Sequence, residues 1–303
     1  MRMNRDTSQS LQRRLALAGG LNAAIFLLEL AGGFLTNSLG LVSDAMHNLS
    51  DLLGLGVSYT ASKVAVRQSN SQKSYGYLRA EIIAAFINAL TLVLVGIYII
   101  YEGIVRFRNP RVVTGLWMTV IALVALAANT AATLLLRRDA RHDLSVRSAF
   151  LHLLGDAIQS LAVIVAGALI YWKNLYFLDS VVSIAIGVFL IVSARGIIQE
   201  AVNILAEGAP ESLDVNAVAS FLRQFPEVEG IHHLHIWSLS SRFHALSAHI
   251  VVRDQMLSDG VRLAKVMEKA LKHRFQIDHS TLQLETEPCD GQTAIVSPND
   301  LQG

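Results

Sequence analysis

Six apolar stretches dominate this sequence, and each is long enough to cross a lipid bilayer as a helix, which takes about 20 residues. They lie approximately at residues 15–35, 39–64, 82–101, 113–136, 149–172 and 178–198. Only the short segment "TNS" separates the first two, so we expect these to form a tight antiparallel hairpin. The sequence therefore predicts an α-helical membrane protein with six transmembrane helices.

The composition agrees with a membrane protein and excludes other classes. Charged residues make up 16% of the 303 residues, against about 25% in soluble globular proteins. The formal net charge of +1 argues against nucleic acid as a partner. The single cysteine, Cys289, excludes both an internal disulfide framework and a multi-cysteine metal site within one chain.

The positions of the basic residues predict the orientation in the membrane, because Lys and Arg are enriched in cytoplasmic loops. Basic residues precede the first stretch, follow the second and follow the fourth. They are Arg2, Arg5, Arg13, Arg14, Lys63, Arg67, Lys73, Arg79, Arg137, Arg138, Arg141 and Arg147. The segment "RFRNPRVV" is an exception on the opposite side. We expect both termini to be cytoplasmic in a multi-pass protein of the cell inner membrane, without a cleaved signal peptide.

The sequence changes character after "NILAEGAP" and becomes typical of a soluble α+β domain. Helical spacing runs over residues 211–225 and 257–275, and alternation typical of strands runs over residues 228–240, 243–254 and 280–287. This order suggests a small sandwich with helices on one face of an antiparallel sheet. The predicted boundaries are an N-terminal cytoplasmic segment 1–14, a transport domain 15–200, a linker 201–210, a cytoplasmic domain 211–288 and a tail 289–303.

A histidine lies four residues before an aspartate in two of the apolar stretches. These pairs are His47 with Asp51 and His152 with Asp156. Residues i and i+4 share one face of a helix, so two such helices packed together present two imidazoles and two carboxylates. That set suits tetrahedral Zn²⁺. The alternative is that each pair is a hydrogen bond between packed helices, but intramembrane ionisable residues are usually functional, and the repeated spacing favours a metal site.

Other polar residues lie in the apolar stretches with weaker indications. Asp44, three residues before His47, is either a pathway residue that helps release an ion or a solvated carboxylate near a helix end. A further group either lines a path or joins helices by hydrogen bonds. Its members are Glu29, Asn88, Asn129, Gln159 and Asp179.

The segments "HNLSD", "HLLGD", "SYGYLRAE", "EGAP" and "HHLHIWSLS", in this order, resemble the cation diffusion facilitator family, and most closely its bacterial zinc exporters. The resemblance implies a homodimeric proton-coupled antiporter with a cytoplasmic ferredoxin-like domain. It implies export of Zn²⁺, with Co²⁺, Ni²⁺ or Cd²⁺ as secondary cargo, and a transport site at His47, Asp51, His152 and Asp156. Histidine at the first of these positions is associated with zinc in the family.

The resemblance also implies a metal site in the cytoplasmic domain, for which His232, His249 and Glu285 are the best matches. Glu287 and Cys289 are weaker candidates. Three such ligands from three strands make a plausible Zn²⁺ site, although polar residues on paired strands also meet without a metal. The row formed by His233, His235 and Trp237 is expected to have a packing role. The loop "VRQSNSQKS" lacks the histidines that some members of the family use for a further site, and His142 is interpreted as a solvated loop residue.

Three other functions compete with an antiporter. An intramembrane metalloenzyme needs a metal with an open coordination position and a nearby general base, and no HExxH motif is present, so we expect no enzyme activity. A membrane-anchored metal sensor does not require six spans with polar interiors, and a passive channel fits poorly with four tight ligands. In an antiporter, His47 and His152 would exchange protons for the metal, while Asp51 and Asp156 supply charge. Besides metal ions and protons, we expect membrane lipid to be a partner of this protein.

Overall fold

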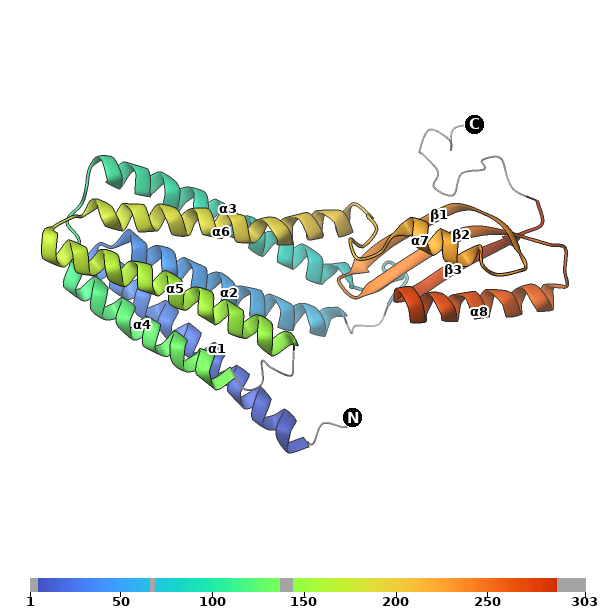
Figure 1. Ribbon diagram of the computed structural model, residues 1–303, viewed down its shortest axis with the longest axis horizontal. Helices are drawn as coiled ribbons and strands as arrows, with labels where there is room; N and C mark the ends of the chain where they lie inside the picture. Colours follow the sequence, from blue (N-terminus) through green and yellow to red (C-terminus); the bar gives the residue numbers. More distant parts are fainter. Residues whose placement is uncertain (1–4, 66–68, 137–143, 288–303) are drawn as a thin grey trace. The chain divides into compact units, whose positions relative to one another are not determined.

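The computed structural model describes residues 5–65, 69–136 and 144–287, and six long helices form most of the part before residue 206 (Figure 1). Each predicted apolar stretch overlaps one of them. The helices are α1 (Arg5–Thr36), α2 (Leu39–Ala65), α3 (Arg79–Arg108), α4 (Gly115–Leu136), α5 (Leu144–Lys173) and α6 (Phe177–Leu205). Among the residues that the structure describes, four segments are long and apolar enough to cross a membrane. These are Gly19–Thr36, Arg79–Arg108, Gly155–Lys173 and Phe177–Leu205, and Gly115–Ala131 is a shorter apolar helix.

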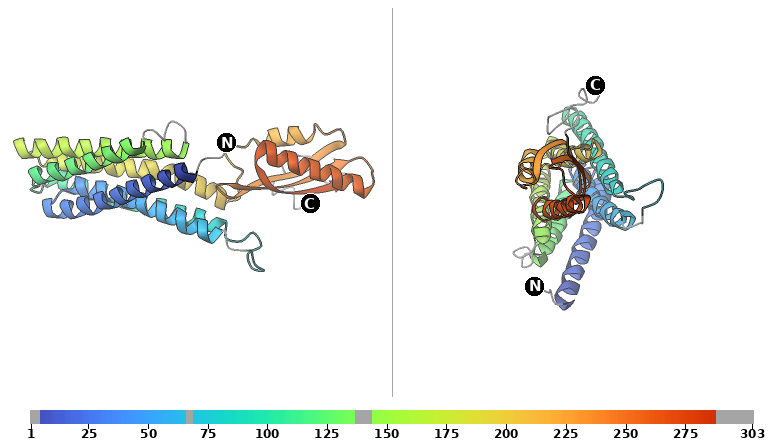
Figure 2. Two further views of the ribbon diagram at one scale, coloured as in Figure 1. Left: turned by 90° about the horizontal axis from the view of Figure 1, so that it is seen from below. Right: turned by 90° about the vertical axis from the view of Figure 1, so that its right-hand side faces the viewer.

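Glycine allows helices α4 and α5, which lie side by side, to pack at close range (Figures 1 and 2). A Cβ atom added to Gly167 would lie 2.6 Å from Thr119 Oγ1 and 3.2 Å from the carbonyl oxygen of Gly115. Small residues permit this approach of two backbones, and in lipid such packing replaces the hydrophobic effect as the force between helices. The glycines therefore fix the distance between α4 and α5.

The N-terminus of α2 is capped by a carboxylate from another helix. Asp179, in the first turn of α6, accepts hydrogen bonds from the backbone N–H groups of Leu39 (2.8 Å) and Gly40 (3.0 Å). The hydroxyl of Ser38 donates to the same carboxylate at 2.6 Å. The first N–H groups of a helix have no partner within the helix, and a negative charge is favourable there. Of the two readings left open for Asp179, the structure therefore supports the one that joins helices.

The contacts divide the chain into two compact units, residues 1–59 with 87–197, and residues 60–86 with 198–303. The second unit contains α7 (Val215–Leu222), β1 (Val228–Ser240), β2 (Phe243–Val252), α8 (Leu257–Phe275) and β3 (Ile277–Glu285). The three strands form one sheet in the order β1-β2-β3. Its core joins the two helices to one face of the sheet. The most buried side chains are Val218, Leu222, Leu246, Ile250, Met267, Leu271 and Ile277.

Two details of the predicted cytoplasmic domain were wrong. Strands β2 and β3 are parallel, with His249 opposite Gln283, so the sheet is mixed rather than antiparallel. The cause is α8, which connects these two strands as a crossover helix, the connection that parallel strands require.

The first helix of the cytoplasmic domain is shorter than the predicted residues 211–225. It begins after Asp214, whose side chain accepts a hydrogen bond from the backbone N–H of Asn216 and so acts as a helix N-cap.

Strand β1 contains a β-bulge that changes which side chains share a face. His232 lies opposite His249, while His235 lies opposite Ser247, so β1 has one more residue than β2 between these pairs. His233 takes up the extra length with a positive φ of 48°, a conformation that is costly for most side chains. The strand thus departs from strict alternation at the point where its histidines lie.

The bulge places His232 on the face of the sheet opposite the core. Ile231, Leu234 and Ile236 all belong to the core, which strict alternation cannot achieve because Ile231 and Leu234 are three residues apart. Without the bulge, His232 would share the face of Leu234 and Ile236. With it, His232 contacts Glu285 of β3.

Candidate metal centres

Helices α2 and α5 bring His47, Asp51 and Asp156 together. His47 Nε2 lies 3.2 Å from Asp156 Oδ1 and 3.8 Å from Asp51 Oδ2. One candidate ligand atom from each of the three side chains lies within 4.8 Å of the other two. His47 and Asp156 are buried, and Asp51 is half-buried. One imidazole and two carboxylates at this spacing can hold a divalent cation.

The fourth predicted ligand, His152, has a side chain outside the described residues. Its backbone belongs to α5, one helical turn before Asp156. The ring of Phe189 from α6 meets the His47 ring edge to face, with 5.7 Å between the ring centres. An aromatic neighbour of this kind restricts the orientation of the imidazole.

Asp44 is buried beside this group, with only 2% of its surface exposed. The interpretation of Asp44 as a solvated carboxylate near a helix end is therefore wrong. The hydroxyl of Ser160 from α5 lies 3.5 Å from Asp44 Oδ2. Glu29 of α1 is fully buried and accepts a hydrogen bond of 2.7 Å from the Asn48 side chain. Sequence reasoning missed Asn48, although it lies one helical turn after Asp44 and so shares its face.

A second group of candidate ligands lies in the cytoplasmic domain and comprises His232, His249 and Glu285. The carboxylate of Glu285 bridges the two imidazoles, at 3.1 Å from His232 Nε2 and 2.7 Å from His249 Nδ1. Candidate ligand atoms of the three residues also lie within 4.8 Å of one another. Of the two weaker candidates, Glu287 is exposed, and Cys289 lies outside the described residues, as does His142.

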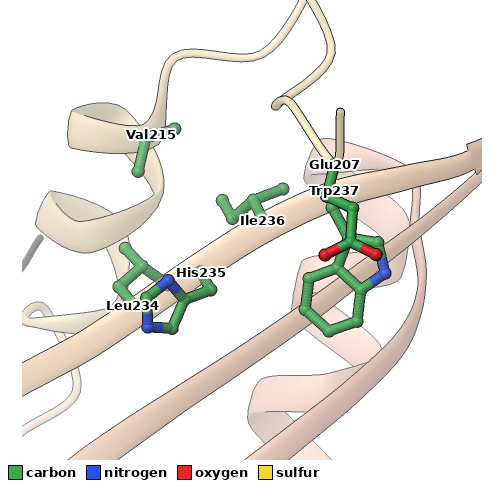
Figure 3. A pocket seen from close by; sticks show the side chains of 6 residues that line it. All are labelled: Glu207, Val215, Leu234, His235, Ile236 and Trp237. Atoms are coloured by element: carbon green, nitrogen blue, oxygen red, sulfur yellow. The ribbon is translucent and has the colours of Figure 1, made fainter. Parts of the chain in front are cut away.

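His233, His235 and Trp237 differ in how far they are buried, because His233 and Trp237 are half-buried and His235 is exposed. The ring of His233 stacks on that of His249, with 4.9 Å between the ring centres. His235 is exposed, so a packing role is wrong for this residue. With Trp237 and Glu207 it lines a hollow of about 270 Å³, to which the core residues Leu234 and Ile236 also contribute (Figure 3).

The conformation of His233 leads to a testable expectation for the cytoplasmic group. A β-branched residue tolerates a positive φ poorly, whereas glycine adopts it without cost. We therefore expect His233→Val to disturb the bulge and lower Zn²⁺ binding by this group at least about tenfold, equivalent to about 1.4 kcal/mol. His233→Gly should retain most of the binding. Isothermal titration of the full-length protein, with Asp51→Ala in both variants to remove the membrane group, measures the difference. Equal loss in both variants would instead make the imidazole of His233 itself the important feature.

Comparison with known proteins identifies the class to which this chain belongs. Residues 15–206 match the family described as the cation efflux transmembrane domain, and residues 210–287 match the cation efflux protein cytoplasmic domain. The chain therefore belongs to the cation efflux, or cation diffusion facilitator, family. It is a multi-pass membrane transporter and not an enzyme, so the metalloenzyme alternative is set aside.

Several relatives are similar over nearly their whole length. The chain is 37% identical over 273 residues to the cadmium, cobalt and zinc/H(+)-K(+) antiporter of Bacillus subtilis, covering 89% of this chain and 88% of the relative. It is 37% identical over 281 residues to the zinc transporter ZitB of Escherichia coli, covering 92% and 89%. It is 32% identical over 279 residues to the metal cation efflux system protein CzcD of Cupriavidus metallidurans, covering 92% and 88%.

Proposed function

We propose that this protein exports Zn²⁺ from the cytoplasm in exchange for protons, with Co²⁺, Ni²⁺ or Cd²⁺ as secondary cargo. The transport site comprises His47, Asp51, His152 and Asp156. The observation that carries the proposal is the convergence of His47, Asp51 and Asp156 from two helices in the interior of a cation efflux protein. The names of its relatives, which include a zinc transporter and an antiporter for cadmium, cobalt and zinc, support the choice of cargo and of protons.

The exchange of metal for protons follows from the chemistry of the ligands. A metal ion binds the neutral form of an imidazole, and an imidazole titrates near neutral pH. Loss of the metal removes the charge that keeps His47 and His152 deprotonated, so protons take its place. Asp51 and Asp156 supply the negative charge that offsets the cation in a medium of low dielectric constant. The inward proton gradient then drives the outward movement of Zn²⁺.

The cytoplasmic group of His232, His249 and Glu285 forms a second Zn²⁺ site in this proposal. The matched cytoplasmic domain is shared by cation efflux proteins, and we infer that it joins two copies of the chain into a homodimer. Both termini lie in the cytoplasm, and the domain boundaries predicted from the sequence are retained. A membrane-anchored sensor is the alternative, in which this second site alone would matter.

Zinc uptake by proteoliposomes that contain the purified protein tests the proposal. We expect Zn²⁺ uptake, read from a trapped fluorescent indicator, to rise at least about tenfold when the vesicle interior is acidic relative to the outside. Protons leaving the vesicle then drive the metal in. Protein-free vesicles under the same gradient measure the leak. Uptake that is equal with and without the gradient would exclude proton coupling, and no uptake in either case would favour a sensor.

A further inference from the structure

A buried group of three oxygen-bearing side chains lies between α1 and α2, and the proposed transport site does not use it. Glu29, Asp44 and Asn48 have 0%, 2% and 1% of their surfaces exposed. The Asn48 amide donates to Glu29 Oε2 at 2.7 Å, and Asp44 lies one helical turn before Asn48 on the same face of α2.

This group has more acceptor oxygens than donors. Glu29 Oε1 and Asn48 Oδ1 are both buried, and neither has a hydrogen-bond partner among the described residues. Burial of an acceptor without a donor costs about 1–3 kcal/mol. The sequence contains no Lys or Arg between residues 15 and 62, so neither α1 nor α2 supplies a permanently charged cation at this depth.

A divalent cation satisfies such a group better than a proton does. Two ionised carboxylates buried near each other in a medium of low dielectric constant are stable only if a proton or a metal ion offsets their charge. A single proton forms one hydrogen bond and leaves the other oxygens without a partner. A divalent cation binds several oxygens at once, and carboxylate and amide oxygens are common metal ligands.

We propose that Glu29, Asp44 and Asn48 form a second, oxygen-only site that receives the transported divalent cation as it leaves His47. Asp44 lies between His47 and Leu39, where α2 begins. With both termini in the cytoplasm, that end of α2 is the outer one, so the direction of movement rests on the proposed export function. Zn²⁺ binds imidazole readily, whereas sites made of carboxylate and carbonyl oxygens suit harder ions. The cation is therefore held more weakly here than at His47, as release requires.

Equilibrium binding tests the site independently of transport. The background variant combines His47→Ala, Asp51→Ala, His249→Ala and Glu285→Ala, which removes both proposed zinc sites from the full-length protein in lipid nanodiscs. We expect isothermal titration with ZnCl₂ to find one remaining Zn²⁺ per chain. Adding Glu29→Gln should weaken this binding at least about tenfold, which is about 1.4 kcal/mol. No binding to the background variant, or equal binding after Glu29→Gln, would overturn the proposal. Either result is obtained whether or not the protein is an exporter.

Transport kinetics provide the second measurement, in a protein that carries Glu29→Gln alone. The substitution preserves size and leaves an oxygen that accepts from Asn48, so we expect a melting temperature near that of the wild type. Zinc uptake should show kcat at least about tenfold lower with KM within about twofold, because loading at His47 is intact and release is slowed. A higher KM with unchanged kcat would overturn the proposal by placing Glu29 at the loading step.

Two further points concern a matched control variant and a proton as the alternative occupant of the site. Glu102→Gln in α3 makes the same change at a carboxylate that pairs with Arg106 at 2.9 Å, and it should leave both kinetic constants unchanged. A proton is the alternative occupant. If Glu29→Gln abolished the dependence of uptake on the pH gradient while zinc binding stayed intact, the group would carry a proton and the proposed metal site would be wrong.

Discussion

Asp156→Ala is expected to reduce zinc transport to below about one hundredth of the wild-type rate. Asp156 is 2% exposed and lies 3.2 Å from His47 Nε2, so its carboxylate offsets positive charge at a place that water does not screen. Removing a residue that only supports a metal ligand already lowers metal affinity or activity about 10–100-fold. Removing a ligand itself should therefore cost at least about one hundredfold. The isosteric Asp156→Asn should lose nearly as much, because it keeps the shape and removes the charge.

The measurement is the initial rate of Zn²⁺ uptake by proteoliposomes under a fixed pH gradient, at equal amounts of inserted protein. Glu102→Gln is the control for the loss of a carboxylate within the helices, since its amide oxygen can still accept a hydrogen bond from Arg106. If Asp156→Ala kept more than about half of the wild-type rate, the paired motif would be structural. The proposed transport site would then be wrong.

Gly167→Leu is expected to have the largest effect on the stability of the membrane domain. Even a Cβ at this position would lie 2.6 Å from Thr119 Oγ1 and 3.1 Å from the Thr119 backbone nitrogen. The backbone cannot move aside without separating α4 from α5. Inserting atoms into a well-packed core costs about 1–3 kcal/mol or more, and a larger value applies where the obstacle is backbone. At about 3 kcal/mol, the melting temperature should fall by about 10 °C.

Gly196→Leu in α6 is the matched control. It makes the same substitution at an exposed position where an added Cβ meets nothing within 4 Å. Thermal unfolding in detergent, followed by light scattering and by size-exclusion chromatography after heating, compares the two variants. An equal fall for both would attribute the loss to the substitution of glycine in a helix, and the close approach of α4 and α5 would carry no special weight.

The sequence was sufficient to predict the elements that depend on local patterns. Hydropathy placed the six long helices, and alternation placed β1 and β2. The His-x-x-x-Asp spacing predicted that His47 and Asp51 share a helix face. The contact of His47 with Asp156 followed from the same spacing on α5. The composition of the complete four-ligand site stays a prediction, since the side chain of His152 is outside the described residues.

The features that sequence reasoning missed depend on how elements meet. The link between Glu29 and Asn48 is set by the rotation of α1 against α2, which no local pattern specifies. The parallel pairing of β2 with β3 was available from the sequence, because a helix of 19 residues between two strands favours a parallel crossover. The bulge also left a signal. Ile231 and Leu234 break the alternation of β1, and such a break indicates an extra residue.

The hydrogen bonds from Leu39 and Gly40 to the carboxylate of Asp179 hold the N-terminal end of α2 in place, so a tilt of α2 would pivot about that end. At a rise of about 1.5 Å per residue, His47 lies about 12 Å from Leu39, and Val57 lies about 27 Å away. A tilt of about 10° around the fixed end moves His47 by about 2 Å and Val57 by about 5 Å. A tilt of this size moves His47 by about the length of a Zn–N bond, and it moves Val57 more than twice as far. One tilt of α2 can therefore change both the ligand distances at the proposed metal site and the space at the other end of the helix.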